Sequence, residues 1–190
     1  MSRLGWLLSL AFVFCGNAQA EKDWHLGWMG GLIQPTVNDP AGPTDSKSTT
    51  QWKDVVFMYD YSRDYRLLAM AKQHSYTLNA SPINIGQDVD HTGLDATIQK
   101  NFRLSRSFKP WIGAGVGYAS EKYEPRYRVT PTGFLSVVYP DRKETGIALI
   151  ANASAQWASF ADTQTGIHLQ YEYGMGNLSR LFSVSLFISY

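Results

Sequence analysis

Apolar and polar residues alternate along much of this chain, and the final stretch shows the pattern most clearly. Phe182, Val184, Leu186, Ile188 and Tyr190 occupy every second place, and serine fills three of the four places between them. Residues two apart in a strand share a face. The stretch therefore predicts a strand with one apolar face and one mostly small, polar face.

Seven further stretches alternate in the same way, and turn-forming residues separate them. Together with the last one, they cover residues 24–33, 53–61, 65–76, 93–102, 111–119, 147–157, 167–173 and 182–190. The stretch at 65–76 is ambiguous, because residues 67–71 are all apolar. Here we expect Arg66 and Lys72 to face the polar side.

The connections between these stretches alternate in length. Short ones are expected at 62–64, 104–108 and 159–162, whereas those at 34–51, 79–90 and 120–145 are long and that at 174–180 is shorter. Short periplasmic turns and long external loops are typical of outer-membrane barrels, and an even strand number leaves both chain ends on the periplasmic side. The sequence therefore predicts an all-β fold, an eight-stranded antiparallel transmembrane β-barrel. A soluble barrel or sandwich is the alternative, but it explains the loop lengths less well.

The first twenty residues have the pattern of a cleavable export signal. Arg3 supplies the positive start, residues 4–14 form a short apolar core, and Ala18-Gln19-Ala20 is a small-residue cleavage site. The only cysteine, Cys15, falls within this segment. We expect a signal peptide over 1–20, a barrel domain over 21–190, and export to the outer membrane of a bacterial cell.

The composition agrees with a membrane barrel and gives no argument for nucleic-acid binding. Aromatic residues make up 14% of the chain, and the net charge is +1. Aromatic rings collect at membrane interfaces, so we expect a girdle near the short turns, with Tyr59, Tyr171 or Tyr173 at the opposite interface. The proposed girdle residues are Trp24, Tyr61, Tyr65, Phe102, Trp111, Trp157 and Tyr190.

A barrel of eight strands encloses only enough space for side chains. The polar faces should therefore form a packed network in which Lys72, Arg66 and His168 neutralise buried acids. Glycines at 113, 115 and 117 would leave room for large neighbours such as Met58 or Met70. The expected inward polar residues are Asp54, Asp95, Thr97, Gln99, Asn101, Asn152, Ser154, Gln156, His168, Gln170 and Glu172.

The segment Phe108-Lys-Pro-Trp-Ile-Gly-Ala-Gly-Val-Gly-Tyr118, together with the eight-strand pattern, resembles the small outer-membrane barrels. These include the membrane domain of outer membrane protein A, outer membrane protein X and the neisserial opacity proteins. The resemblance implies a monomer with mobile external loops, surrounded by outer-membrane lipids and lipopolysaccharide. It also implies that the barrel-assembly machinery recognises the C-terminal strand.

Two patterns in the sequence are candidates for catalytic sites. Small barrels that deacylate lipid A carry a serine two places after a histidine, but Gln170 stands there after His168, so the nucleophile is missing. A second cluster has the residue types that a lipid A palmitoyltransferase would use. It consists of His74, Ser75, Asp88, Asp90 and His91.

The longest connection, Ser120–Thr145, contains β-prone residues and is expected to continue two strands as an exposed ribbon. A ribbon edge can pair with a strand of another protein. We therefore expect a structural or adhesin-like surface role, with no catalytic, cofactor-binding or metal-binding residues. The alternatives are a narrow channel for small solutes and, third, a lipid A-modifying enzyme.

Overall fold

The computed structural model describes residues 24–36, 49–78, 84–104, 110–160 and 163–190. The expected signal peptide, Met1–Ala20, lies outside the described residues. Strands account for most of the described chain, and no helix in it is long and apolar enough to cross a membrane. The strands are β1 (Trp24–Thr36), β2 (Thr49–Asp60), β3 (Tyr65–Leu78), β4 (Asn84–Asn101), β5 (Trp111–Tyr123), β6 (Arg126–Val129), β7 (Leu135–Tyr139), β8 (Arg142–Phe160), β9 (Thr163–Gly174) and β10 (Arg180–Ser189).

Eight of these ten strands close into an antiparallel barrel, and β6 and β7 form a separate hairpin. The order around the barrel is β1-β2-β3-β4-β5-β8-β9-β10, and β1 pairs with β10 to complete the ring. Every backbone donor and acceptor in a closed sheet finds a partner on a neighbouring strand, which is the condition for crossing a bilayer. The predicted eight-stranded barrel is confirmed.

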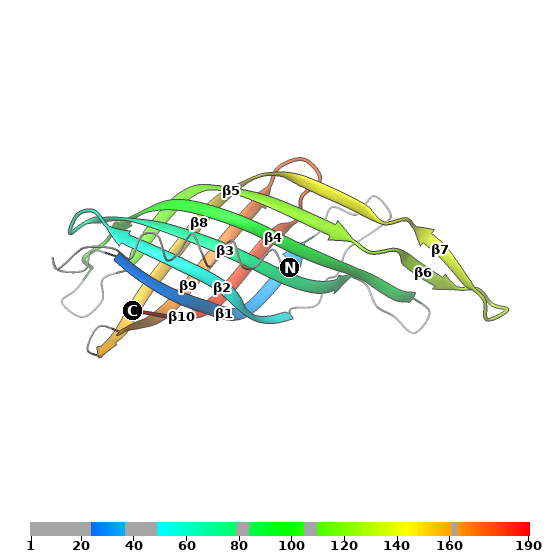
Figure 1. Cartoon of the computed structure of the whole chain (residues 1–190), viewed down its shortest axis with the longest axis horizontal. Coiled ribbons are helices and arrows are strands. Elements are labelled where there is room, and N and C mark those ends of the chain that lie inside the picture. The colour runs from blue at the N-terminus through cyan, green and yellow to red at the C-terminus, as the bar shows by residue number, and fades with distance from the viewer. Residues whose placement is uncertain (1–23, 37–48, 79–83, 105–109, 161–162) are drawn as a thin grey trace, which may run out of the picture.

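Successive connections around the barrel lie at alternate ends of it (Figure 1). We call the end with the β2–β3, β4–β5 and β8–β9 connections the turn end, and the opposite end the loop end. β1 begins and β10 finishes at the turn end, where the Leu26 amide donates to the Tyr190 carbonyl at 3.0 Å. The β6–β7 hairpin projects from the loop end (Figure 1).

The strands at the loop end are longer than the hydrophobic pattern predicts. β4 begins at Asn84 and β8 at Arg142, so much of the expected 79–90 and 120–145 loops is strand. The ribbon expected within Ser120–Thr145 is present: β5 and β8 continue to the pair Tyr123 and Arg142, and β6 pairs with both β7 and β4. Beyond the part of the wall that lipid would surround, the outer face of a strand meets water and need not be apolar. The alternation that marks a strand in the sequence therefore disappears toward the loop end.

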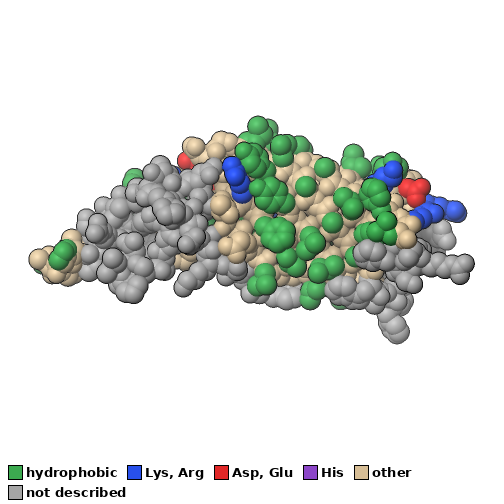
Figure 2. Space-filling model, turned by 180° about the vertical axis from the view of Figure 1, so that it is seen from behind, with side chains coloured by type: hydrophobic (Ala, Val, Ile, Leu, Met, Phe, Trp, Pro, Cys, Tyr) green, Lys and Arg blue, Asp and Glu red, His purple; other side chains and the backbone are tan. Residues whose placement is uncertain are grey.

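The two faces of the barrel follow the predicted alternation. Arg66 and Lys72 both point inward, with 1% and 5% of their surface exposed, which resolves the ambiguous third strand. Figure 2 shows hydrophobic side chains gathered over the middle of the wall, with charged side chains toward its ends. The exposed belt includes Trp28, Leu32, Leu94, Ile98, Ile112, Val116, Tyr118, Ile147, Leu149, Leu186 and Ile188.

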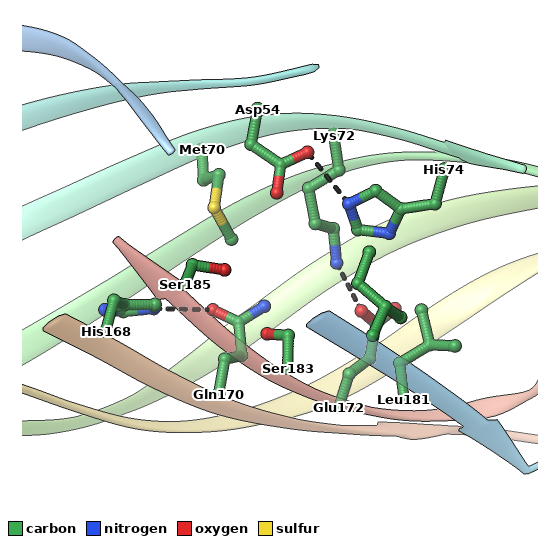
Figure 3. Close-up of a pocket in the computed structure, with 11 residues that line it drawn as sticks. Asp54, Met70, Lys72, His74, His168, Gln170, Glu172, Leu181, Ser183 and Ser185 are labelled. Carbon is green, nitrogen blue, oxygen red and sulfur yellow. Dashed lines mark hydrogen bonds and ion pairs between the residues drawn. The ribbon is translucent and has the colours of Figure 1, made fainter. Parts of the chain in front are cut away.

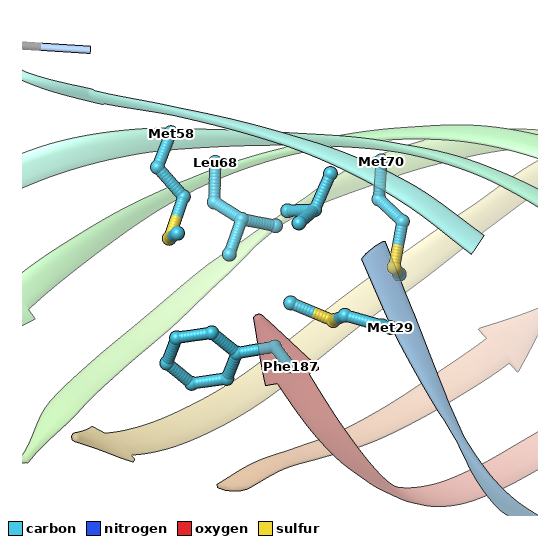
Figure 4. Packing of buried hydrophobic residues seen from close by; sticks show 6 residues of the cluster. Met29, Met58, Leu68, Met70 and Phe187 are labelled. Carbon is cyan, nitrogen blue, oxygen red and sulfur yellow. The ribbon is translucent and has the colours of Figure 1, made fainter. Parts of the chain in front are cut away.

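Part of the interior is apolar. One cluster lies against β1, β2, β3 and β10 and contains Met29, Val56, Met58, Leu68, Met70 and Phe187 (Figure 4). A second cluster, nearer the loop end, contains Ile33, Tyr76, Val89, Tyr123 and Leu181. The cavity beside the glycines of β5 is filled differently from the prediction, since a Cβ at Gly113 would meet Gln99 and Asn152 rather than methionine.

The expected aromatic girdle is present in part. Tyr61 and Tyr65 stack with ring centroids 6.1 Å apart at the turn end, and Phe102 and Tyr190 are exposed there. Trp111 does not belong to the girdle, because it points into the barrel and is 7% exposed. Tyr59 also differs from the expectation: it pairs with Trp24 near the turn end, not at the opposite interface. The side chain of Trp157 lies outside the described residues.

Candidate functional site

Near the turn end, Arg66 links interior side chains from several strands. Its guanidinium donates to Gln99 Oε1 at 2.5 Å and to Ser154 Oγ at 2.6 Å, and it lies 4.4 Å from the centre of the Trp111 ring. Gln99 in turn donates to Asn152 Oδ1 at 2.8 Å. Arg66 thus joins β3, β4, β5 and β8 across the barrel. Its hydrogen bonds go to neutral groups, and the acid with which it interacts electrostatically is Asp60.

The middle of the barrel contains a buried cluster of charges. Lys72 Nζ lies 2.8 Å from Asp95 Oδ2 and donates to Glu172 (Figure 3). Gln170 Nε2 donates to the same Asp95 oxygen at 2.7 Å, and His168 Nε2 lies 3.3 Å from Gln170 Oε1. Lys72 therefore neutralises buried acids as predicted, whereas His168 bonds an amide and not an acid.

Two histidines above this cluster bind the remaining buried acids. His74 Nε2 lies 2.8 Å from Asp54 Oδ1, and His91 Nδ1 lies 3.1 Å from Glu121 Oε1. The two imidazoles stack with centroids 5.8 Å apart. Sequence reasoning did not assign these roles, although His74 has the inward parity of Lys72 and His91 that of Asp95.

The β9–β10 turn folds back over the loop end of the interior. Leu178 and Ser179 are buried, and the Ser179 amide donates to both carboxylate oxygens of Glu121 at 3.2 Å. The Tyr123 hydroxyl donates to Glu121 Oε2 at 2.6 Å, and the Tyr76 hydroxyl donates to Ser179 Oγ at 3.1 Å. This contact, which we call the Glu121–Ser179 latch, was not predicted, because the residues are distant in sequence.

The cavity among the buried charges is small. A cavity of about 10 Å³ lies among Asp54, Lys72, His74 and Glu172 (Figure 3). A cavity needs roughly 10–15 Å³ to hold one water molecule. The described interior therefore has room for about one water at this point and is packed with side chains on either side of it.

The cluster proposed as a palmitoyltransferase-like site does not assemble. His74 and His91 point inward, whereas Ser75 donates to Asp90 at 2.7 Å on the outer face, and Thr77 donates to Asp88 there at 2.6 Å. Adjacent residues of a strand point to opposite faces, so the sheet wall separates the histidines from the serine and the acids. Among the described residues, no group of three or more His, Cys, Asp or Glu side chains is placed to hold a metal ion.

The β6–β7 hairpin presents apolar side chains to solvent at its tip. Phe134 is 73% exposed and Leu135 is 62% exposed. Gly133, with φ of 83°, forms the tight turn in front of them, where its amide donates to the Thr130 carbonyl at 2.8 Å. A positive φ suits glycine, so the turn that displays Phe134 is locally encoded.

No protein-family model and no curated protein matches this chain, but solved structures do. Neisserial surface protein A aligns with a TM-score of 0.60 at 14% identity, over 88% of this chain and 96% of that protein. OprG of Pseudomonas aeruginosa aligns at 0.56 and 11% identity, over 92% and 99%. Ail, the attachment invasion locus protein of Yersinia pestis, aligns at 0.50 and 15% identity, over 88% and 98%.

This chain has the fold of the small eight-stranded outer-membrane β-barrels. The distribution of its side chains agrees with that fold, since the exposed belt is apolar and the charged groups of the interior are paired. The chain therefore has the fold of an outer-membrane β-barrel, with an apolar belt on the outside of the wall where a bilayer would surround it.

Proposed function

We propose that this barrel is closed to solutes and acts through its loop end, in a structural or adhesin-like role, without catalysis. One observation carries the proposal: side chains fill the interior of the barrel over the described residues. The Arg66 and Lys72 networks, the stacked histidines and two apolar clusters occupy it, and the cavity between them has about 10 Å³. A barrel without a wet path has only its outer surface and loops with which to meet other molecules.

The loop-end ribbon supplies a contact surface. It extends the β4, β5 and β8 wall beyond the belt and ends in the exposed Phe134 and Leu135. Exposed large apolar side chains at a tip, held by a tight turn, suit contact with another protein. The names of two proteins with this fold, neisserial surface protein A and the attachment invasion locus protein, support a surface role. We expect the loop end to face outward from the cell.

Two measurements test the proposal. In planar bilayers the purified barrel should show no steady conductance, and a stable open state would reject the closed interior and favour the channel. In a cell-adhesion assay, the variant Phe134→Ser/Leu135→Ser should bind less than the parent. The matched control is Met175→Ser in the β9–β10 turn, where the side chain is also exposed; equal binding by all three proteins would reject the hairpin as the contact surface.

The enzyme alternative has its own test. Mass spectrometry of lipid A from cells with and without the protein should show the same acyl chains. A reproducible gain or loss of an acyl chain would overturn the non-catalytic role.

A further inference from the structure

Two lysines face each other on the outer wall just above the apolar belt. On neighbouring strands β5 and β8, the outward-facing pairs toward the loop end are Tyr118 with Ile147, then Ser120 with Thr145, then Lys122 with Lys143. Tyr118 and Ile147 are 58% and 55% exposed and belong to the belt. We call Lys122 and Lys143 the lysine pair.

The lysine pair is unfavourable for the isolated chain. Side chains directly opposite each other on paired strands lie close, and like charges there are destabilising. The positive charge of Lys122 is partly neutralised, since its ammonium lies 3.6 Å from the Glu124 carboxylate and Asp90 pairs with Lys122 on the neighbouring strand β4. The charge of Lys143 is not neutralised in this way: β9 pairs with β8 only from Ala148 onward, and no ion pair reaches Lys143 among the described residues.

The depth of the lysine pair matches a lipid headgroup. Ser120 and Thr145 form the polar edge of the belt, and the lysines lie two residues farther along tilted strands, or about 5 Å along the barrel axis. The headgroup layer of one leaflet is roughly 5–8 Å thick. The ammonium groups therefore lie at the level of the headgroups when the belt spans the hydrocarbon.

We propose that Lys122 and Lys143 together bind the phosphate group of a lipid in the loop-end leaflet. The phosphate would lie between the two ammonium groups and replace their repulsion with charge-assisted hydrogen bonds. The acyl chains would run down the belt over Tyr118 and Ile147, so the occupant is a phosphorylated lipid and not a free phosphate ion. The inference rests on insertion of the barrel in a membrane and is independent of the adhesive role.

A third outward lysine, Lys100, has aromatic neighbours for its ammonium group and no cation opposite it. Lys100 lies on β4 at the turn end, and its ammonium is 5.8 Å from the Tyr65 ring centre and 5.6 Å from that of Phe102. It pairs across to Ile112 and not to another cation. Lys100→Gln is therefore the matched control, because it removes one outward positive charge from the opposite end of the belt.

Titration in detergent micelles, read by native mass spectrometry, tests the site with dioleoyl phosphatidic acid as the probe. The parent and Lys100→Gln should bind it with the same apparent association constant. Each lysine near a membrane surface contributes about fivefold to the binding of anionic lipid, so Lys122→Gln/Lys143→Gln should bind about thirtyfold more weakly. In micelles without the probe, the double variant should be at least as stable to urea as the parent, because the like-charge contact is gone.

Two further probes separate the sources of phosphate. Dioleoylglycerol has the same acyl chains and no phosphate, and inorganic phosphate has no chains. The parent should bind each of these probes much more weakly than it binds phosphatidic acid. The double variant should bind each of them as the parent does. Binding of inorganic phosphate as tight as that of the lipid would overturn the proposal. So would phosphatidic acid binding by the double variant within twofold of the parent, or an equal loss in Lys100→Gln.

Discussion

At the scale of single residues, the buried charges in the middle of the barrel depend on one side chain. Among the described residues, Lys72 is the only cation that contacts both Asp95 and Glu172. Removing one partner of a buried ion pair leaves an uncompensated charge and costs about 3–5 kcal/mol. Lys72→Met, which keeps the length of the side chain, should therefore lower the free energy of unfolding by about that amount in urea titrations of the folded barrel.

Two comparisons decide whether charge is the cause. Lys100→Met, on the outside of the barrel, should change the same free energy by less than about 0.5 kcal/mol. The triple variant Lys72→Met/Asp95→Asn/Glu172→Gln should regain part of the loss, because the uncompensated acids are gone. A triple variant less stable than Lys72→Met would indicate lost packing or hydrogen bonds instead.

Gly113 lies where the interior of the barrel has no room for a larger side chain. A Cβ at this position would lie 2.5 Å from the Ile98 carbonyl oxygen, 2.6 Å from Gln99 Cγ and 2.9 Å from Asn152 Oδ1. Gln99 and Asn152 are buried partners in the Arg66 network. Gly113→Ala should thus destabilise the barrel by about 1–3 kcal/mol through overpacking, measured by urea unfolding. Ala114→Val, one residue later on the exposed face, should be close to neutral. Equal effects at the two positions would contradict the inward placement of Gly113.

At the scale of elements, the Glu121–Ser179 latch holds the β9–β10 turn in the barrel mouth. Hydrogen bonds to a charged group contribute about 1.5–3 kcal/mol each. In Glu121→Ala the Ser179 amide should therefore exchange its hydrogen roughly ten- to hundredfold faster, as followed by NMR in detergent. Removing the exposed Glu124, which contacts Lys122, should leave this rate unchanged. Unaltered exchange in Glu121→Ala would show that other contacts hold the turn.

At the scale of the whole molecule, stability depends on which side of the wall a side chain faces. Val116 is exposed in the middle of the belt, between Ala114 and Tyr118 on β5. An arginine at the bilayer midplane of a barrel costs about 2–4 kcal/mol, so Val116→Arg should lose that much stability in lipid vesicles. Phe134→Arg, at the hairpin tip, should lose less than about 0.5 kcal/mol. Equal losses would place the belt outside the hydrocarbon.

Much of this architecture could be predicted from the alternation of apolar and polar residues in the sequence. The alternation at 111–119, 147–157 and 182–190 marked strands and their outward faces correctly, because one face must be apolar wherever lipid surrounds the barrel. The inward positions of Arg66 and Lys72 also followed, since a charged side chain within the belt is far more stable inside than in lipid. The pattern failed above the belt: β4 starts at Asn84, where water on the outside no longer demands an apolar face.

The partners inside the barrel needed the tertiary structure. Alternation over 65–76 places His74 on the same face as Lys72, whereas His91 and Glu121 lie outside the predicted strands. Which of these side chains meet depends on strand register and barrel shear, which bring residues from distant strands to one level. The proposed cluster of His74, Ser75, Asp88, Asp90 and His91 fails for a different reason: these residues do lie at one level of β3 and β4, but the pleat divides them between the two faces of the wall.

By itself the sequence determined the number of strands in the barrel, the direction that most side chains face within the apolar belt and the end at which the short turns lie, because these depend on local alternation and on the turn residues. Only the tertiary structure decided that Lys72 joins β4 to β9, that Ser179 reaches Glu121, and that Lys122 stands opposite Lys143. The first two contacts depend on how the eight strands are staggered in the closed barrel, and the third depends on the register between β5 and β8. No single stretch of the chain contains that information.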